Sequence, residues 1–152
     1  MLEKFYPIIA AVFANLLAQI IKPIPHYLQH REWKWTLIFD SGGFPSSHSS
    51  LVVGLTTALG LQSNFQSNEF FIAAVFSLTV LYDAANVRYY TGQNIKLTKQ
   101  LIEDVEVLLQ TNLDNPIYQQ KIKMVLGHKW VEVFGGIILG ILSACLLYLK
   151  IG

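Results

Sequence analysis

A histidine and four serines lie close together at residues 41–49, which read Ser-Gly-Gly-Phe-Pro-Ser-Ser-His-Ser. Pro45 suits the first turn of a helix, and the hydroxyls of Ser46 and Ser47 could cap it. The N–H groups at a helix start attract anions, and His48 in that turn could hydrogen-bond or protonate a bound phosphate. The alternative is a well-capped helix that carries a histidine without chemical use.

A second pair of residues suited to chemistry is His128 and Glu132, which lie four positions apart in Gly-His-Lys-Trp-Val-Glu. On a helix this spacing puts both side chains on one face. The carboxylate could then hold the imidazole in one tautomer and raise its basicity, as expected of an activated histidine nucleophile. The alternative is an exposed pair at a helix start.

Asp83 and Arg88 form a third set near the end of an apolar segment. Charged residues within or beside membrane spans are costly and are therefore candidates for function. Asp83 could form a structural ion pair with Arg88 or another basic residue, or it could belong to a site. The forked donors of Arg88 could equally hold a phosphate group.

The composition indicates the kind of scaffold that positions these sets. Of the 152 residues, 53% are hydrophobic and 14% are charged, and the mean hydropathy is +0.41. Soluble domains carry about 25% charged residues, so insertion into a membrane explains the deficit. We predict a single all-α membrane-embedded domain over residues 1–152. Its four transmembrane helices lie near residues 5–21, 46–62, 70–88 and 130–149.

Three further features refine this helical bundle. Apolar positions at helical spacing predict an amphipathic helix over residues 95–113, which could lie on the membrane or cover the bundle. Residues 5–21 resemble a signal peptide but lack a clear cleavage site, so we interpret them as a retained helix. Gly136 and Gly140 in the last span could allow close helix packing.

The distribution of lysine and arginine predicts how the chain is oriented. The connection between the first two spans holds three basic residues, and the connection between the last two, with its flanks, holds six. The connection at residues 63–69 holds none, and the two remaining basic residues lie near the termini. The positive-inside rule then places all three motif sets on the cytoplasmic side and both termini outside.

The sequence gives little sign of metal, cofactor or nucleic-acid binding. Cys145 cannot form a disulfide within the chain, because it is the only cysteine, and we interpret it as a small apolar residue. His26 and His30 could bind a metal but lack an obvious third ligand. The net charge of +1 favours no particular partner. We therefore expect no metal, no cofactor and no nucleic acid.

At these motifs the chain resembles the divergent, short-chain branch of the type 2 phosphatidic acid phosphatase and vanadium haloperoxidase superfamily. The resemblance covers nearly the whole chain. It is carried by Gln19 with Lys22, residues 42–49, Tyr82-Asp83-Ala84 with Val87-Arg88, Leu126-Gly127-His128, and Glu132-Val133. The superfamily's Pro-Ser-Gly-His motif corresponds to Pro-Ser-Ser-His at residues 45–48. The histidine and aspartate that end its third motif correspond to His128 and Glu132.

The resemblance implies roles for these residues. His128 would be the nucleophile, oriented by Glu132, and His48 would protonate the leaving group. Ser46, Ser47 and nearby N–H groups would bind phosphate oxygens. The first motif, a lysine followed six residues later by Arg-Pro, is absent, and the arginine of the third motif falls at Ile122. Lys22, Arg31 and Lys34 are nearby substitutes for the first motif, although none matches its spacing, and Lys121, Lys123 or Arg88 could supply the charge of the missing arginine.

The expected function is therefore hydrolysis of a lipid phosphate monoester in a bacterial, cyanobacterial or plastid-type membrane. The alternative is a non-catalytic binder or carrier of phosphorylated lipids that uses the same pocket. The missing cations favour the carrier, whereas the retained histidines and Glu132 favour the enzyme. A vanadate-dependent oxidase is a third alternative. It is disfavoured because stable vanadate binding in that group relies on the motif cations that this sequence lacks. A four-helix bundle of this size could also form a homodimer.

Overall fold

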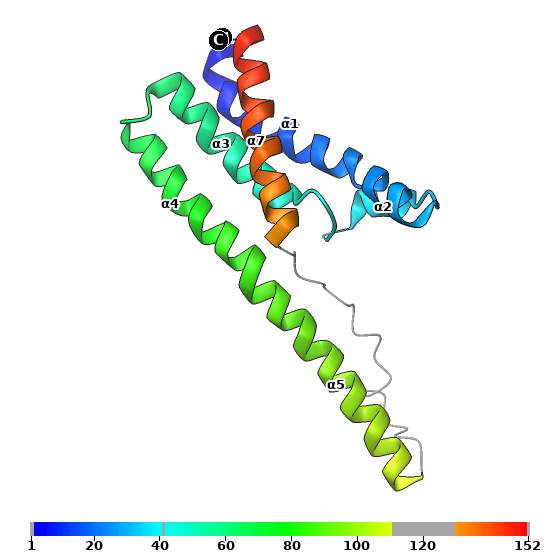
Figure 1. Ribbon diagram of the computed structural model, residues 1–152. Helices are drawn as coiled ribbons and strands as arrows, with labels where there is room; N and C mark the ends of the chain where they lie inside the picture. The colour runs from blue at the N-terminus through cyan, green and yellow to red at the C-terminus, as the bar shows by residue number, and fades with distance from the viewer. Residues whose placement is uncertain (1, 41, 111–129, 152) are drawn as a thin grey trace.

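The computed structural model describes residues 2–40, 42–110 and 130–151, in which every regular element is a helix (Figure 1). The predicted all-α class is confirmed. The elements in chain order are η1 (Leu2–Phe5), α1 (Tyr6–Ile21), α2 (Pro23–His30), η2 (Trp35–Phe39), α3 (Ser47–Ser63), α4 (Asn68–Tyr82), the π-helical turn η3 (Asp83–Val87), α5 (Arg88–Leu109) and α7 (Trp130–Ile151).

Three described helical stretches are long and apolar enough to cross a membrane, namely Glu3–Leu28, Asn68–Leu109 and Trp130–Ile151. The fourth predicted span, α3, is shorter and less apolar, and it lies at the centre of the bundle against α1, α4 and α7. Because other helices surround α3, it needs small residues for close packing more than large apolar ones for contact with lipid. Its buried side includes Val52, Gly54, Ala58 and Gly60.

Small residues bring the helices around α3 close together. A Cβ atom on Gly54 would lie 3.1 Å from the Cβ of Ala14 in α1. A Cβ atom on Gly140 of α7 would lie 2.8 Å from the carbonyl oxygen of Ser50. The prediction that the glycines of the last span permit close packing is therefore confirmed. Without a hydrophobic effect between helices in lipid, such close contact is a main source of attraction.

The start of α1 and the end of α7 lie together at the end of the bundle away from residues 42–49 (Figure 1). The buried Tyr6 hydroxyl of α1 donates a 2.8 Å hydrogen bond to the carbonyl oxygen of Ala144 in α7. Near the same end, the Gln62 side chain donates to the carbonyl oxygen of Glu3. Each bond contributes on the order of 1 kcal/mol. Together they join the outer ends of α1, α3 and α7.

The predicted amphipathic helix is not a separate element. The chain continues from α4 through η3 into α5, so residues 68–109 form one helical stretch of 42 residues. At 1.5 Å per residue it is roughly 63 Å long, about twice the thickness of a hydrocarbon core. Figure 1 shows α5 extending away from the bundle, so it does not cover the other helices. Residues 111–113 of the predicted helix lie outside the described residues.

A hydrogen-bonded group of side chains joins α3 to α4 halfway along their length. The hydroxyls of Thr56 and Ser77 lie 2.7 Å apart. The carbonyl oxygen of Val52 lies 2.9 Å from the Thr56 hydroxyl and 3.0 Å from the Ser77 hydroxyl. Since each hydroxyl has a single proton, at least one of them donates to this carbonyl oxygen, and the other donates to it or to the neighbouring hydroxyl. Only Ala73 and Ser77 of α4 are buried. This hydrogen-bonded group, which we call the Thr56–Ser77 clamp, is therefore a principal attachment of α4 to the bundle.

Candidate functional site

The loop before α3 is shaped by its glycine, proline and serine residues. Gly43 has a φ of 99°, a backbone conformation that residues other than glycine rarely adopt. The Phe44–Pro45 peptide bond is cis. Ser46 then caps α3, since its hydroxyl oxygen accepts a 3.3 Å hydrogen bond from the Ser49 N–H group. The prediction of a helix start capped by Ser46 is thus confirmed, but Pro45 precedes the N-cap and does not lie in the first turn, since α3 begins at Ser47. The N–H groups of such a first turn have no partners within the helix.

The serines around His48 are buried and fasten α3 to its neighbours. The Ser46 N–H group donates a 2.9 Å hydrogen bond to the carbonyl oxygen of Glu132, at the start of α7. The Ser49 hydroxyl donates to that of Ser46 at 2.9 Å, and Asn15 of α1 donates to the carbonyl oxygen of Ser47 at 3.1 Å. The Ser46 hydroxyl is therefore committed to the helix cap in this state. The same contacts hold the loop against both α1 and α7.

Lys22, just after α1, is the buried cation closest to this loop. Only 3% of its surface is exposed, and its ammonium group donates a 2.5 Å hydrogen bond to the carbonyl oxygen of Asp40. A Cβ atom on Gly43 would lie 3.9 Å from the Lys22 side chain. Burial opposes the positive charge of the ammonium group, and the charges of Asp40 and Glu132 favour it to a smaller extent. Lys22 therefore brings a cationic side chain to the base of the loop.

Glu132 lies in the first turn of α7, where the helix dipole stabilises a negative charge. Its backbone carbonyl holds Ser46, and its carboxylate acts on Lys22, so one residue joins the second motif set to the first. Its predicted partner His128 lies outside the described residues, and the proposed pairing of the two stays a prediction.

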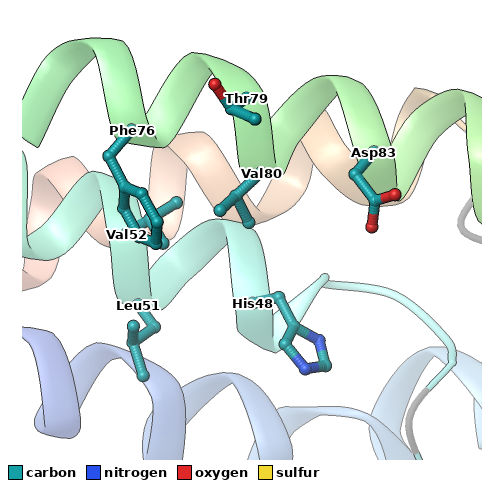
Figure 2. Close-up of a pocket in the computed structure, with 7 residues that line it drawn as sticks. All are labelled: His48, Leu51, Val52, Phe76, Thr79, Val80 and Asp83. Carbon is teal, nitrogen blue, oxygen red and sulfur yellow. The ribbon is translucent and has the colours of Figure 1, made fainter.

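His48 and Asp83 line one cavity between α3 and α4, with a volume of about 480 Å³ (Figure 2). Asp83 begins the π-helical turn η3, and such turns are frequent at functional sites. The next two residues, Ala84 and Ala85, are buried against Val133 of α7. The turn thus packs the end of α4 against α7 and brings Asp83 to the same end of the bundle as His48.

The other predicted cations are less closely associated with the loop. Lys34 and Arg31 are exposed, and in the described residues no hydrogen bond joins either side chain to residues 42–48. Arg88 begins α5, and its side chain lies outside the described part of the chain. The rings of His26 and His30 in α2 lie 4.7 Å apart, without a third His, Cys, Asp or Glu that could complete a metal site among the described residues.

Two residues that support the site were not predicted, Asn15 and Asp40, and Gly136, which was predicted to permit close helix packing, has a part in the site as well. Asn15 holds the first turn of α3, the Asp40 carbonyl oxygen binds Lys22, and Gly136 lets α7 approach the carbonyl oxygen of Ser46. An asparagine inside an apolar span is a recognisable signal, because polar groups there usually have partners. A hydrogen bond to a backbone carbonyl group, such as that of Asp40, cannot be recognised from residue types in the sequence.

The family of the chain follows from comparison with known sequences. The model of the Divergent PAP2 family matches residues 4–143. The chain is also 32% identical over 147 residues to the Uncharacterized membrane protein YuiD of Bacillus subtilis (strain 168), a match that covers 93% of each chain. No solved structure is significantly similar to it. The motif sets, the helical membrane bundle and these matches agree: the chain is a membrane protein that belongs to the Divergent PAP2 family.

Proposed function

We propose that this protein hydrolyses lipid phosphate monoesters at one surface of the membrane. The observation that carries the proposal is the meeting of three chain segments at one end of the bundle. The Ser46–Glu132 hydrogen bond joins the loop that bears His48 to the start of α7, and Gly43 of the same loop lies beside the Lys22 side chain. A buried cation beside a helix start suits a phosphate group.

In the proposed reaction, a nitrogen atom of His128 attacks phosphorus and forms a phosphohistidine, and the bond to the lipid oxygen breaks. His48 gives its proton to the departing alkoxide. Water then attacks the phosphohistidine and loses its proton to His48, which releases inorganic phosphate and restores His128. Lys22 and the N–H groups at the start of α3 stabilise charge on the phosphate oxygens. Glu132, four residues after His128, would orient it.

Aromatic residues near the site support a position at headgroup depth. The rings of Tyr27, Trp33 and Trp35 form a stack with centroid distances of 4.4 and 5.3 Å. Trp33, Trp35 and Trp130, the three tryptophans of the chain, are exposed and occur in segments that adjoin the site. Tryptophan and tyrosine favour the boundary between lipid and water. A lipid headgroup at this level would meet the loop that bears His48.

A second candidate function is binding or carriage of phosphorylated lipids without turnover. The observation that favours it is the environment of Lys22, whose ammonium group already bonds to the Asp40 carbonyl and lies under the influence of two carboxylates. Part of its charge is thereby neutralised. Phosphoryl transfer depends strongly on the charge that stabilises the equatorial oxygens. A site with this compensation could hold a phosphate and release it unchanged.

Phosphate release from a panel of lipid phosphates by purified, detergent-solubilised protein tests the proposal. Loss of a nucleophile or a general acid typically costs about 100-fold or more in rate. We therefore expect His128→Ala and His48→Ala each to reduce phosphate release at least that far. His30→Ala serves as the control, because His30 is an exposed histidine in α2.

The outcomes separate the two candidate functions. Release that His128→Ala leaves unchanged would rule out the phosphohistidine mechanism. A folded wild-type protein that binds lipid phosphates but releases no phosphate across substrates and pH would favour the carrier.

We further infer that the site faces the cytoplasm and both termini face outward, since nine of the eleven basic residues fall in or beside the two connections at the site's end. The test uses single cysteines in a Cys145→Ala background. A membrane-impermeant maleimide added to intact cells should label Gln66→Cys, in the exposed connection between α3 and α4, and not Glu32→Cys, which is exposed near the site. The opposite labelling pattern would reverse the orientation.

A further inference from the structure

The cavity between α3 and α4 has a polar end and an apolar end. His48 and Asp83 lie together at one end, whereas Leu51, Val52 and Phe76 lie toward the other, with Val80 between them (Figure 2). Thr79 completes the lining. Phe76 and Thr79 are both exposed, so the cavity opens on the outer side of α4. In a membrane that side faces lipid.

The size of the cavity suits part of one alkyl chain. Along α4 and the first residue of η3, its lining runs from Phe76 to Asp83, roughly 10 Å at 1.5 Å per residue. This is about two thirds of one monolayer of a 30 Å hydrocarbon core. At the deep end the Thr56–Ser77 clamp draws the two helices together through the carbonyl oxygen of Val52. One end of the cavity therefore lies near this clamp, and the other lies at His48 and Asp83.

We propose that this cavity binds the segment of a single alkyl chain nearest the headgroup of a lipid phosphate. The inference rests on the proposed function for its ligand. The order of lining residues suits the alkyl segment of such a molecule, because His48, in the loop proposed to bind the phosphate, lies at one end of the cavity and the remainder is largely apolar. A free inorganic phosphate would gain nothing from the apolar part. The chain enters sideways between α3 and α4, and the cavity selects for the width of the chain near its headgroup, not for its total length.

Photolabelling in lipid nanodiscs tests this inference without requiring turnover. The probe is a long-chain alkyl phosphate that carries a diazirine on the first part of its chain, and mass spectrometry locates the label. In the wild-type protein the label should map to residues of α3 and α4 that line the cavity, and excess unlabelled alkyl phosphate should compete. Val80→Trp places a large side chain in the cavity and should reduce labelling about tenfold, a change equal to about 1.4 kcal/mol. Val75→Trp is the matched control, since Val75 lies on the exposed side of α4 and does not line the cavity.

A second variant guards against misfolding of the first. Leu51→Trp fills the cavity from α3 and should reduce labelling similarly. Labels outside α3 and α4, no competed label in the folded wild-type protein, or labels unchanged in both cavity variants would overturn the inference. Phosphate release measured on the same samples judges the proposed function separately. Turnover with a label elsewhere would reject the cavity alone, and a label in the cavity without turnover would reject the enzyme alone.

Discussion

Replacement of Lys22 with methionine should lower the affinity for lipid phosphates by about 10- to 100-fold. Methionine keeps much of the length and apolar surface of the side chain but removes the buried ammonium group. A hydrogen bond to a charged group contributes roughly 1.5–3 kcal/mol, and each 1.4 kcal/mol is a factor of ten. The change also leaves Asp40 and Glu132 without the cation on which their charges act. Their uncompensated charge would further oppose an anion.

Competition with a fluorescent alkyl phosphate in detergent provides the measurement. Lys34→Met is the matched control, because it removes the same charge from an exposed position. We expect this control to change the affinity little, since exposed charges are well screened. Thermal unfolding of both variants would show whether they fold. An unchanged affinity in a folded Lys22→Met protein would mean that Lys22 is a structural cation, and equal losses in the two variants would indicate only a general effect of charge.

Alanine at Gly136 should destabilise the protein and disturb the loop, whereas alanine at the adjacent Gly135 should not. A Cβ atom on Gly136 would lie 2.5 Å from the carbonyl oxygen of Ser46 and 2.7 Å from the Cβ of Ser49. A backbone carbonyl cannot move aside unless α3 shifts away from α7. Overpacking of this kind costs about 1–3 kcal/mol. The Ser46–Glu132 hydrogen bond next to the contact would be strained as well.

The neighbouring glycine makes this comparison specific. The atoms nearest to a Cβ atom on Gly135 would be ring atoms of Phe44, an exposed side chain that can rotate away. Both substitutions gain the same helix propensity, about 1 kcal/mol, so it cancels between them. We expect the Tm of Gly136→Ala in detergent to fall by several degrees relative to Gly135→Ala, together with weaker binding of lipid phosphate. Equal Tm values would contradict the close approach of α7 to α3.

The helical class and the positions of the motif sets could be predicted because membrane insertion leaves few choices. Backbone polar groups in lipid must bond within the same segment, so an apolar run becomes a helix. Alternate spans then bring alternate connections to one side. This reasoning placed residues 41–49, Asp83 and Glu132 at one end of the bundle, and the described contacts agree.

The continuity of α4 with α5 could not be predicted from hydropathy. The polar residues around Gly92 and Gln93 suggest a linker between a span and a surface helix. They contain no proline, however, and one glycine costs a helix only about 1 kcal/mol. The environment of Lys22 was equally inaccessible, since its partner is the carbonyl oxygen of Asp40, eighteen positions along the chain. Backbone partners at such distances depend on tertiary packing rather than on residue type.

The small-residue interior has a consequence for how such chains can diverge. Inside the bundle, Ala10, Ala14, Gly54, Ala58 and Gly140 are limited by size, because each permits a close approach of helices. On the outside, leucine, isoleucine, valine and phenylalanine can replace one another, since lipid requires only that they be apolar. Large apolar residues should therefore drift freely among related chains while the small ones stay. Sequence comparisons that give most weight to large hydrophobic residues would therefore underestimate the relatedness of membrane proteins whose helices pack through small residues.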